Sequence, residues 1–331
     1  MFSLFTLFGL ALVFGLGSCY ILSLGLRPKN YPPGPRTLPL IGNLHQIPSK
    51  NEYLQFAKWA KEYGPIYSIL AGSRPIIVLS SVEVVKDLLD KRSAIYSDRP
   101  EAYAANHIPI SKLRMVFMPY TPLWRKVRKI AHSLLSIKVV KNYDAYQEME
   151  RKQMLNEMLE NPVDFFPSLQ RYTTSLAATI LFGRRASSSA DPRIRKLDDE
   201  LAALQEAMST GAAALIDGFP ILRYLPEALL PAKANIRRAL QLGHDVHMEN
   251  WYAVKKNIAN GTLGPCLSIG LARAQEKDEG LTDEEAAYTV GNIFEGGMET
   301  TSSTLYAFIQ AMLLFPDVQV KTAVSNLVVL Q

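Results

Sequence analysis

Hydrophobic and polar positions along the chain follow mainly the spacing of helices. Apolar residues recur with helical periodicity over 52–63, and Gly64-Pro65 ends that run. Short β-branched runs at 66–70 and 75–79 flank Ala71-Gly72-Ser73, which predicts a β-hairpin. Further helices are predicted over 82–91, 124–160, 168–182, 198–210 and 232–260. The pattern therefore predicts a mainly α fold with a small β-sheet, in one body rather than two.

The first 26 residues contain no charged side chain. A helix of that length spans about 39 Å, which is enough to cross a hydrocarbon core of about 30 Å. A cleaved signal peptide is the alternative, but a basic start and a clear small-x-small cleavage site are missing. Arg27, Lys29 and Arg36 follow at once, so the body is expected on the cytosolic side. We expect residues 1–26 to be a single-pass transmembrane anchor.

Residues 27–50 form a predicted proline-rich hinge. They include Tyr31-Pro32-Pro33-Gly34-Pro35, and prolines fix φ and remove backbone donors, so this stretch should be semi-rigid and extended. It is either an ordinary linker or a hinge that holds the body at a set angle to the bilayer. Its position directly after the predicted anchor favours the hinge.

Residues 282–314 predict one very long helix. Thr282 and Glu285 form a capping box, and Phe315-Pro316 closes the run. A helix of 33 residues would be about 50 Å long. Such a helix has to cross the whole body, so we expect its middle to be buried.

The middle of this helix reads Gly296-Gly297-Met298-Glu299-Thr300-Thr301. Each glycine costs about 1 kcal/mol relative to alanine in a helix interior, and a buried Glu299 is costly unless it is paired or protonated. Sequences often break such rules at working sites, where glycines let a flat group approach the backbone. The alternative is a kinked, purely structural helix with Glu299 at the surface.

Composition excludes several classes of protein. Lys and Arg total 36 and Asp and Glu total 31, and this scattered excess of +5 does not favour a nucleic-acid binder. The two cysteines, Cys19 and Cys266, cannot make a disulfide framework or a thiolate zinc site. No metal-ligand cluster is predicted, and a reducing, intracellular environment fits best.

Three motifs resemble those of cytochrome P450 enzymes. The segment 296–301 matches the family's helix I pattern, [Ala/Gly]-Gly-x-[Asp/Glu]-Thr-[Thr/Ser]. Trp124-x-x-x-Arg128 matches the helix C pattern, and the proline-rich hinge followed by residues 38–44 is typical of microsomal members. The resemblance covers residues 1–320 and is closest to fungal enzymes of secondary metabolism. It implies the cytochrome P450 fold.

The resemblance assigns roles around a haem cofactor. Trp124 and Arg128 would contact a haem propionate, and Gly296 with Gly297 would keep the oxygen-binding groove open. In the same way, the resemblance implies that Thr300 and Glu299 relay protons as dioxygen is activated. These roles are carried over from the family motifs.

The resemblance also implies a substrate and a partner. Ile293 and Phe294, with the irregular loop at 102–117, would line an apolar pocket. The reaction would insert one oxygen atom into a hydrophobic small molecule, with electrons from NADPH delivered by a membrane-bound NADPH-cytochrome P450 reductase. Arg125, Lys126 and Lys129 are candidates for docking that acidic partner, and an ordinary solvated face is the alternative. The expected location is the endoplasmic reticulum membrane.

The chain departs from the family pattern at two places. Thr121 stands where the family usually has glycine, which concerns only the loop before helix C. Residues 51–331 are expected to be a partial cytochrome P450 domain, the N-terminal two-thirds, ending just after helix I. The family's cysteine loop lies beyond that point, and Cys19 and Cys266 do not match it, so activity is expected to be impaired. The alternatives are a catalytically inactive remnant and a membrane-anchored decoy that binds the reductase.

Overall fold

A computed structural model describes residues 4–100, 102–104, 112–188, 191–209, 212–276 and 280–329. The chain divides into two compact units, where the sequence pattern predicted one body. Unit 1 comprises Met1–Glu101 and Ala214–Leu229, and unit 2 comprises Ala102–Ala213 and Leu230–Gln331. Hydrophobic periodicity reports which face of an element is buried but not which elements share a core, so the division was not visible in the sequence.

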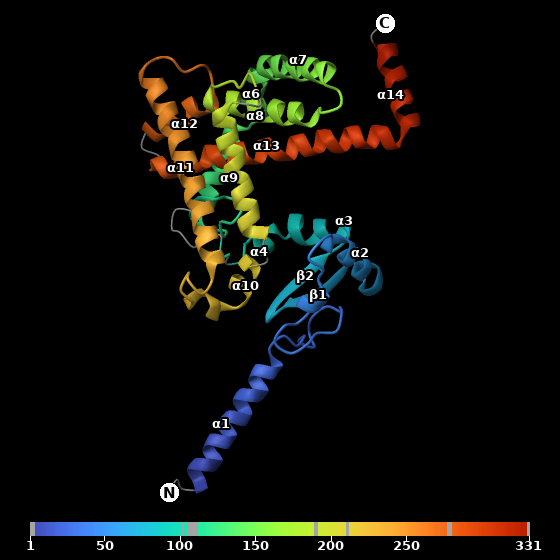
Figure 1. The fold of residues 1–331 in the computed structure, drawn as a ribbon, viewed down its shortest axis with the longest axis vertical. Coiled ribbons are helices and arrows are strands. Elements are labelled where there is room, and N and C mark those ends of the chain that lie inside the picture. Colours follow the sequence, from blue (N-terminus) through green and yellow to red (C-terminus); the bar gives the residue numbers. More distant parts are fainter. Residues whose placement is uncertain are drawn as a thin grey trace. The chain divides into compact units, whose positions relative to one another are not determined.

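The described elements are mostly helices, as predicted (Figure 1). Unit 1 holds α1 (Leu4–Ser23), α2 (Glu52–Tyr63), β1 (Ile66–Ala71), β2 (Arg74–Leu79), α3 (Val82–Val85) and α4 (Ser93–Tyr96). Unit 2 holds α5 (Pro122–Leu134), α6 (Ile137–Val140), α7 (Asp144–Glu160), α8 (Phe166–Phe182), α9 (Pro192–Ser209), α11 (Pro231–Ala259), α12 (Leu267–Glu276), α13 (Asp283–Leu314) and α14 (Pro316–Val329). The short α10 (Ala212–Gly218) falls where the chain passes from one unit to the other.

The predicted hairpin forms the sheet of unit 1. Strands β1 and β2 pair antiparallel, with Ile66 opposite Leu79 and Ala71 opposite Arg74. The turn between them requires Gly72, whose φ of +63° is strained for other residues. Helix α2 packs on β1, and its Trp59 is buried with strand residues. The hairpin and α2 therefore share one small core.

The proline-rich segment is fastened to strand β1 of unit 1. The Arg27 guanidinium donates to the carbonyl oxygens of Gly34 (2.7 Å) and Pro35 (2.6 Å) and to Oγ of Ser68 (2.9 Å). Ser68 in turn donates from its backbone N to Pro33 O at 2.8 Å. A Cβ at Gly34 would lie 2.1 Å from Ser68 O, so only glycine allows this approach. The segment is a fixed part of unit 1 rather than a free linker.

The N-terminal segment forms helix α1, as the sequence predicts, from Leu4 to Ser23. Among the residues that the structure describes, no helix combines the length and the apolar character needed to cross a membrane.

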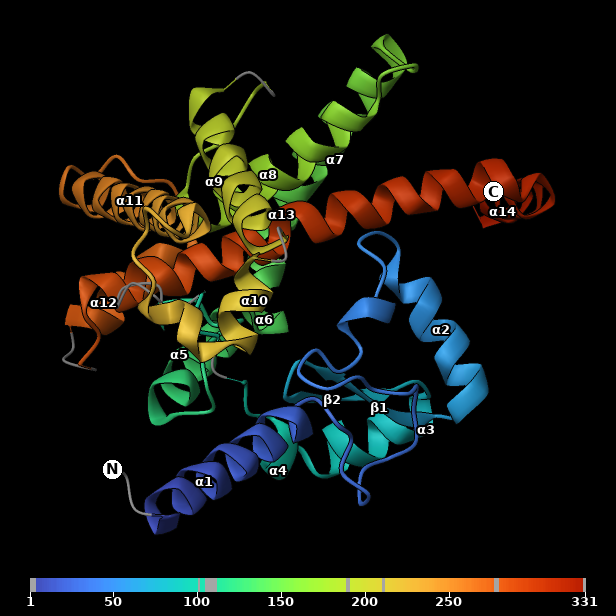
Figure 2. The same cartoon turned by 60° about the horizontal axis from the view of Figure 1, so that its bottom comes forward.

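Helix α13 is the central element of unit 2. It packs along α8 and crosses α11, and its N-terminal half contributes to the main core (Figure 2). The capping box predicted at its start is present, because Glu285 N donates to Thr282 Oγ1 and Thr282 N donates to Glu285 Oε2, both at 3.1 Å. The predicted ends of this helix are confirmed within one residue.

Three features of unit 2 differ from the predicted pattern. The single helix expected over 124–160 is divided into α5, α6 and α7, with a break near Ser136 whose side chain makes no cap. Helix α9 begins six residues earlier than predicted, at Pro192. Helix α12 was not predicted, because it has only 10 residues and follows a Gly-Pro pair. Short helices depend on packing more than on their own periodicity.

Candidate functional site

The middle of α13 presents one buried face and one exposed face. Met298 and Ser302 are buried, whereas Gly296, Thr300 and Thr301 are exposed. The prediction that the whole middle of the helix is buried is therefore wrong. Helical periodicity allows one face to be covered, and the described residues of unit 2 pack only on the side that bears Met298.

The exposed face combines an open backbone with a hydroxyl group. A Cβ added at Gly296 would find no atom within 4 Å, so the surface there is open. One turn later, Thr300 Oγ1 donates a hydrogen bond to Gly296 O at 2.6 Å. Thr304 repeats this contact by donating to Thr300 O at 2.8 Å. Such bonds from Thr hydroxyls to the i−4 carbonyl tend to bend a helix.

Glu299 lies at the surface of the same helix, which was the alternative to a buried position. Its Oε2 accepts a hydrogen bond from Gln205 Nε2 of α9 at 2.5 Å. Both residues line a polar cavity of about 240 Å³ between α8, α9 and α13. Thr173 and Thr174 of α8 line the same cavity. The carboxylate is therefore solvated and connected to neighbouring polar groups.

The two residues predicted to line a substrate pocket pack toward the core. Phe294 is 1% exposed and its ring lies 5.5 Å from that of Phe182 on α8. Ile293 is half-buried and packs against the same core. These positions show a packing role, and the pocket role of both residues stays a prediction.

Helix α5 carries the predicted Trp124 and Arg128. Its N-cap is Thr121, whose Oγ1 accepts from Trp124 N at 3.3 Å, so threonine caps the helix at this position. Trp124 is half-buried with its ring 5.1 Å from that of Tyr120, and Arg128 is exposed one turn later. Lys126 is bound to α13, because its Nζ lies 3.1 Å from Glu285 Oε2. Of the three predicted docking cations, Lys126 is thus already paired.

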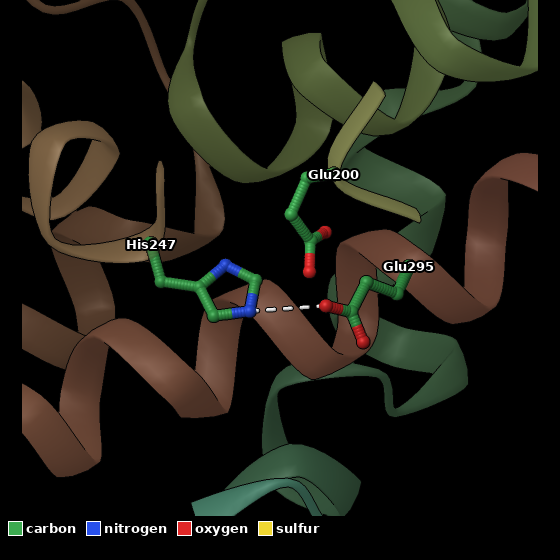
Figure 3. A group of neighbouring side chains, drawn as sticks. All are labelled: Glu200, His247 and Glu295. Atoms are coloured by element: carbon green, nitrogen blue, oxygen red, sulfur yellow. Dashed lines mark ion pairs between the residues drawn. The ribbon is translucent and has the colours of Figure 1, made fainter. Parts of the chain in front are cut away.

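A buried group of charged side chains lies directly before the exposed segment of α13. Glu200 of α9, His247 of α11 and Glu295 of α13 converge there (Figure 3). Nε2 of His247 lies 3.0 Å from Oε1 of Glu295. Arg114 joins them by pairing with Glu200 and, through Nη1, with Oε1 of Glu295 at 2.6 Å. Arg114 and Glu200 are both about 1% exposed, so these charges depend on one another for solvation.

Two glycines provide the space for this group, which we call the Arg114 network. A Cβ at Gly243 would lie 2.2 Å from Nη2 of Arg114, and a Cβ at Gly291 would lie 2.5 Å from Nδ1 of His247. Both glycines are in helix interiors, where they are unfavourable relative to alanine. Their position is explained by the side chains that occupy the space.

Burial and pairing act in opposite directions on the carboxyl groups of the network. Burial raises the pKa of Glu200 despite the nearby charge of Arg114. For Glu295, burial also acts to raise the pKa, but contact with His247 and the charge of Arg114 outweigh it and lower the pKa. The two carboxyls therefore differ: Glu295 holds a negative charge more readily, and Glu200 takes up a proton more readily.

The same three residues have the spacing of a metal site. One ligand atom from each of Glu200, His247 and Glu295 lies within 4.8 Å of the others. However, Arg114 already donates to both carboxylates, and its fixed positive charge competes with a metal cation. We therefore interpret the group as an ion-pair network.

Comparison with known proteins agrees with the motifs on α5 and α13. Residues 32–323 match the family model described as "Cytochrome P450". The chain belongs to the cytochrome P450 family.

Curated relatives of this cytochrome P450 chain come from fungi. It is 45% identical, over 92% of its length, to the cytochrome P450 monooxygenase virE of Hypocrea virens. It is 40% identical, over 89% of its length, to the cytochrome P450 monooxygenase fogE of Aspergillus ruber. These matches cover 56% and 55% of the two relatives, so the chain spans about half the length of the curated relatives it matches.

The cytochrome P450 family implies a haem, and the chain fits one side of such a group. The open backbone at Gly296 and the exposed Thr300 offer a face that a flat cofactor could approach. Haem-thiolate chemistry also needs a cysteine thiolate. Cys266 is 5% exposed, and burial raises the pKa of its thiol, so it is inert. Cys19 belongs to α1. Cys266 therefore does not fit as the thiolate ligand of a haem.

Sequence reasoning found the exposed segment of this cytochrome P450 but missed the Arg114 network. Glu295 directly precedes the recognised motif, yet its partner Arg114 lies 181 positions away in the chain, and Arg114 lies 86 positions from its other partner, Glu200. The available signals were Gly243 and Gly291, two unfavourable residues inside predicted helices. Each glycine indicates that some group packs close to the helix backbone, but not which group it is.

Proposed function

We propose that this chain is the oxygen-groove portion of a haem-thiolate monooxygenase that acts on hydrophobic small molecules in fungal secondary metabolism. The observation that supports it most is the segment 296–301 of α13, where Gly296, Gly297, Glu299 and Thr300 stand in the family's order and all of these but the half-buried Gly297 are exposed. Its fungal relatives with monooxygenase names support the class of reaction.

In this proposal, Thr300 and Glu299 have different roles in proton transfer. Thr300 Oγ1 donates to Gly296 O, so its lone pairs remain available to accept from a group on the open side. Glu299 lies at the edge of a polar cavity and can exchange protons with solvent. A carboxylate and a hydroxyl at adjacent positions suit a short proton path from water to the groove.

Binding of the haem depends on other residues of unit 2. Arg128 is exposed and free to pair with a carboxylate such as a propionate, and Trp124 presents an indole N–H one turn earlier. When bound, a haem held by a thiolate supplies the oxidising power for inserting one oxygen atom into a C–H bond. Gly296 keeps the backbone accessible on that side, whereas a Cβ at Gly297 would lie 3.6 Å from Cβ of Ala177 on α8.

The reduced, carbon-monoxide-bound absorption spectrum tests the proposal. A Soret band of the thiolate type in the 331-residue chain would support a competent haem site. Its absence, with haem supplied during expression, would refute activity for this chain and favour the inactive remnant. The experiment reads the cofactor directly and does not require a known substrate.

Thr300→Val and Thr304→Val make a matched pair for the proton path. Both threonines bond to an i−4 carbonyl of α13, but only Thr300 belongs to the proposed groove. Thr300→Val should lower the fraction of NADPH electrons that appear in product by about tenfold or more, the size of a lost general-acid contribution. Thr304→Val should leave it unchanged. Equal losses in both variants would show a general effect on the helix.

We propose that the exposed basic face of α5 docks the reductase. Cytochrome P450 enzymes generally receive electrons from such a redox partner, and Arg125 and Lys129 are exposed on this helix. Arg125→Glu with Lys129→Glu should weaken reductase capture and reduce its dependence on salt, because the charge pairs that salt screens are lost. Capture without haem binding would support the decoy, and unchanged capture would refute this docking face.

We further propose that residues 1–26 anchor the protein in the endoplasmic reticulum membrane with the body on the cytosolic side. The support is the lack of charge up to Leu26 and the cations that follow it. Carbonate extraction of microsomes tests the proposal. Release of the protein into the supernatant would refute an integral anchor.

A further inference from the structure

The segment that precedes α5 is attached to α13 through the buried side chain of Arg114. Residues 112–118 form a turn around Arg114. Phe117 N and Met118 N both donate to Arg114 O, at 2.9 and 3.1 Å. The Arg114 side chain then leaves this turn and enters the network with Glu200 and Glu295.

We propose that Arg114 is a positioning residue that holds residues 112–118 against α13, one helical turn before Gly296–Thr301, and so fixes one wall of the substrate pocket. The attachment itself stands on contacts in the structure. The effect on the pocket rests on the proposed monooxygenase function.

Asn292 provides a second, neutral attachment at the same place. Its Oδ1 accepts from Met115 N at 3.0 Å, and its Nδ2 donates to Leu113 O at 3.0 Å. The backbone on both sides of Arg114 is thus bound to Asn292, while the Arg114 guanidinium binds Glu295, three positions further along α13. Three contacts on three consecutive residues of the segment specify its register on the helix.

The Arg114 network connects the segment to two further helices. Glu200 belongs to α9 and His247 to α11, so one guanidinium holds the segment, α9 and α13 together. The planar fork of arginine can reach both carboxylates at once, which lysine cannot. A shift of α9 would therefore also displace residues 112–118, because Arg114 is bound to Glu200 of α9.

Incomplete pairing distinguishes this network from a static core contact. Among the described residues, buried polar atoms without a hydrogen-bond partner include Nε of Arg114, Nδ1 of His244 and Oη of Tyr288. All three surround the network, since Tyr288 lies 4.8 Å from His247 and 6.1 Å from His244 between ring centroids. Unpaired buried groups are costly, so this network is less completely satisfied than a fully paired core contact.

Hydrogen exchange at single-residue resolution tests the attachment in the full chain. In Arg114→Met, the amides of Met115 and Met118 should exchange faster by about tenfold or more, because the charged contacts that held the turn are gone. Amides of α8 should be unchanged. Arg114→Lys should restore part of the protection, because one carboxylate can still be reached.

Two further variants keep the test decisive if Arg114→Met does not fold. Glu295→Gln leaves the Arg114–Glu200 pair intact and should still accelerate exchange at Met115. Arg151→Met is the matched control, an arginine of an exposed ion pair in the same unit, and should change nothing. Unchanged exchange at 112–118 in Glu295→Gln, or equal acceleration throughout unit 2, would overturn the proposal.

Ligand binding separates a pocket wall from general packing. In haem-loaded protein, imidazole reports the iron alone, whereas the large apolar azole clotrimazole also contacts the pocket. Arg114→Met should weaken clotrimazole binding about tenfold, read from the Soret shift, and leave imidazole binding unchanged. An equal change for both ligands would overturn the pocket role. Absence of any haem signal in the wild type would refute the proposed function, while the exchange experiment would still decide the attachment.

Discussion

Among its described residues, unit 2 contains two buried charge networks that differ in how completely they are paired. One lies between α7 and α8, where Glu150 is 0% exposed and accepts from Arg171 and Arg185, both at 2.6 Å, and from Ser175 at 2.9 Å. Glu157 accepts from the same Arg171 at 2.8 Å. Two carboxylates thus face two guanidinium groups, and every charge is compensated.

The Arg114 network has one guanidinium group for two carboxylates. Burial raises the pKa of Glu200, which favours its protonated form, and several neighbouring polar atoms lack partners among the described residues. The first network joins two helices that are adjacent in sequence, whereas the second joins three helices and a loop. The difference teaches that a fully paired network holds its helices in one arrangement. A network with unpaired polar atoms is more sensitive to changes in the charges around it.

The largest loss of stability is expected from the complete network. Glu150→Gln would leave Arg171 buried without full compensation, which should lower the free energy of unfolding by about 3–5 kcal/mol. Urea unfolding followed by circular dichroism measures it. Arg151→Met, at the next position but in an exposed pair with Glu148, should cost at most about 1 kcal/mol. Similar losses in the two variants would show that Glu150 is not essential.

A smaller, pH-dependent loss is expected from Arg114→Met. Without the guanidinium, Glu200 and Glu295 can avoid repulsion only if one takes up a proton, and burial already raises the pKa of Glu200. A carboxyl whose pKa is higher in the folded state binds more protons there, so its effect on stability becomes less favourable as pH rises. We expect a loss of about 1–3 kcal/mol, larger at pH 8 than at pH 5. A pH-independent loss would contradict this account.

Two glycines of α13 should respond in opposite ways to the same change. Gly291→Ala places a methyl group 2.5 Å from the His247 ring and should lower the free energy of unfolding by about 1–2 kcal/mol. Gly296→Ala meets open space and should be neutral or stabilising by up to about 1 kcal/mol. Thermal unfolding of both variants measures the contrast. Equal shifts in Tm would show that the space around His247 is not filled as described.

The smallest effect is expected at the N-terminus of α13, where pairing is complete but partly exposed. Asp283 accepts from Trp251 at 3.0 Å and from Lys255 and Gln275 at 2.9 Å. Although burial acts to raise its pKa, these hydrogen bonds lower it. The stabilisation is therefore present above the pKa of about 3.8 in the unfolded chain and is lost as pH falls through the lower folded value. Asp283→Asn should cost about 1 kcal/mol at pH 7 and little at pH 3.

Local signals in the sequence predicted local structure well. The ends of α13 followed from the capping box at Thr282 and from Pro316, and the hairpin followed from Gly72 between two β-branched runs. The segment 296–301 was found because its residues are unfavourable in a helix unless they serve a function. In each case the cause lies within a few residues of the effect.

Features that depend on distant contacts were not predictable. Exposure of Glu299 depends on what packs against α13, and the break between α5 and α7 depends on how those helices meet the rest of unit 2. The ion pairs of Arg114 bridge 86 and 181 residues of sequence. Hydrophobic periodicity carries no information about such pairs, although Gly243 and Gly291 indicated that something large had to fit.

The guanidinium contacts of Arg27 have a mechanical consequence. Since its guanidinium ties Gly34, Pro35 and strand β1 together, a pull or a tilt applied to α1 reaches the hairpin directly instead of being absorbed by slack chain. The prolines between Arg27 and β1 also make this segment a poor protease substrate, because cleavage requires a flexible, extended backbone. One arginine thereby makes the predicted hinge a stiff connection between α1 and the hairpin.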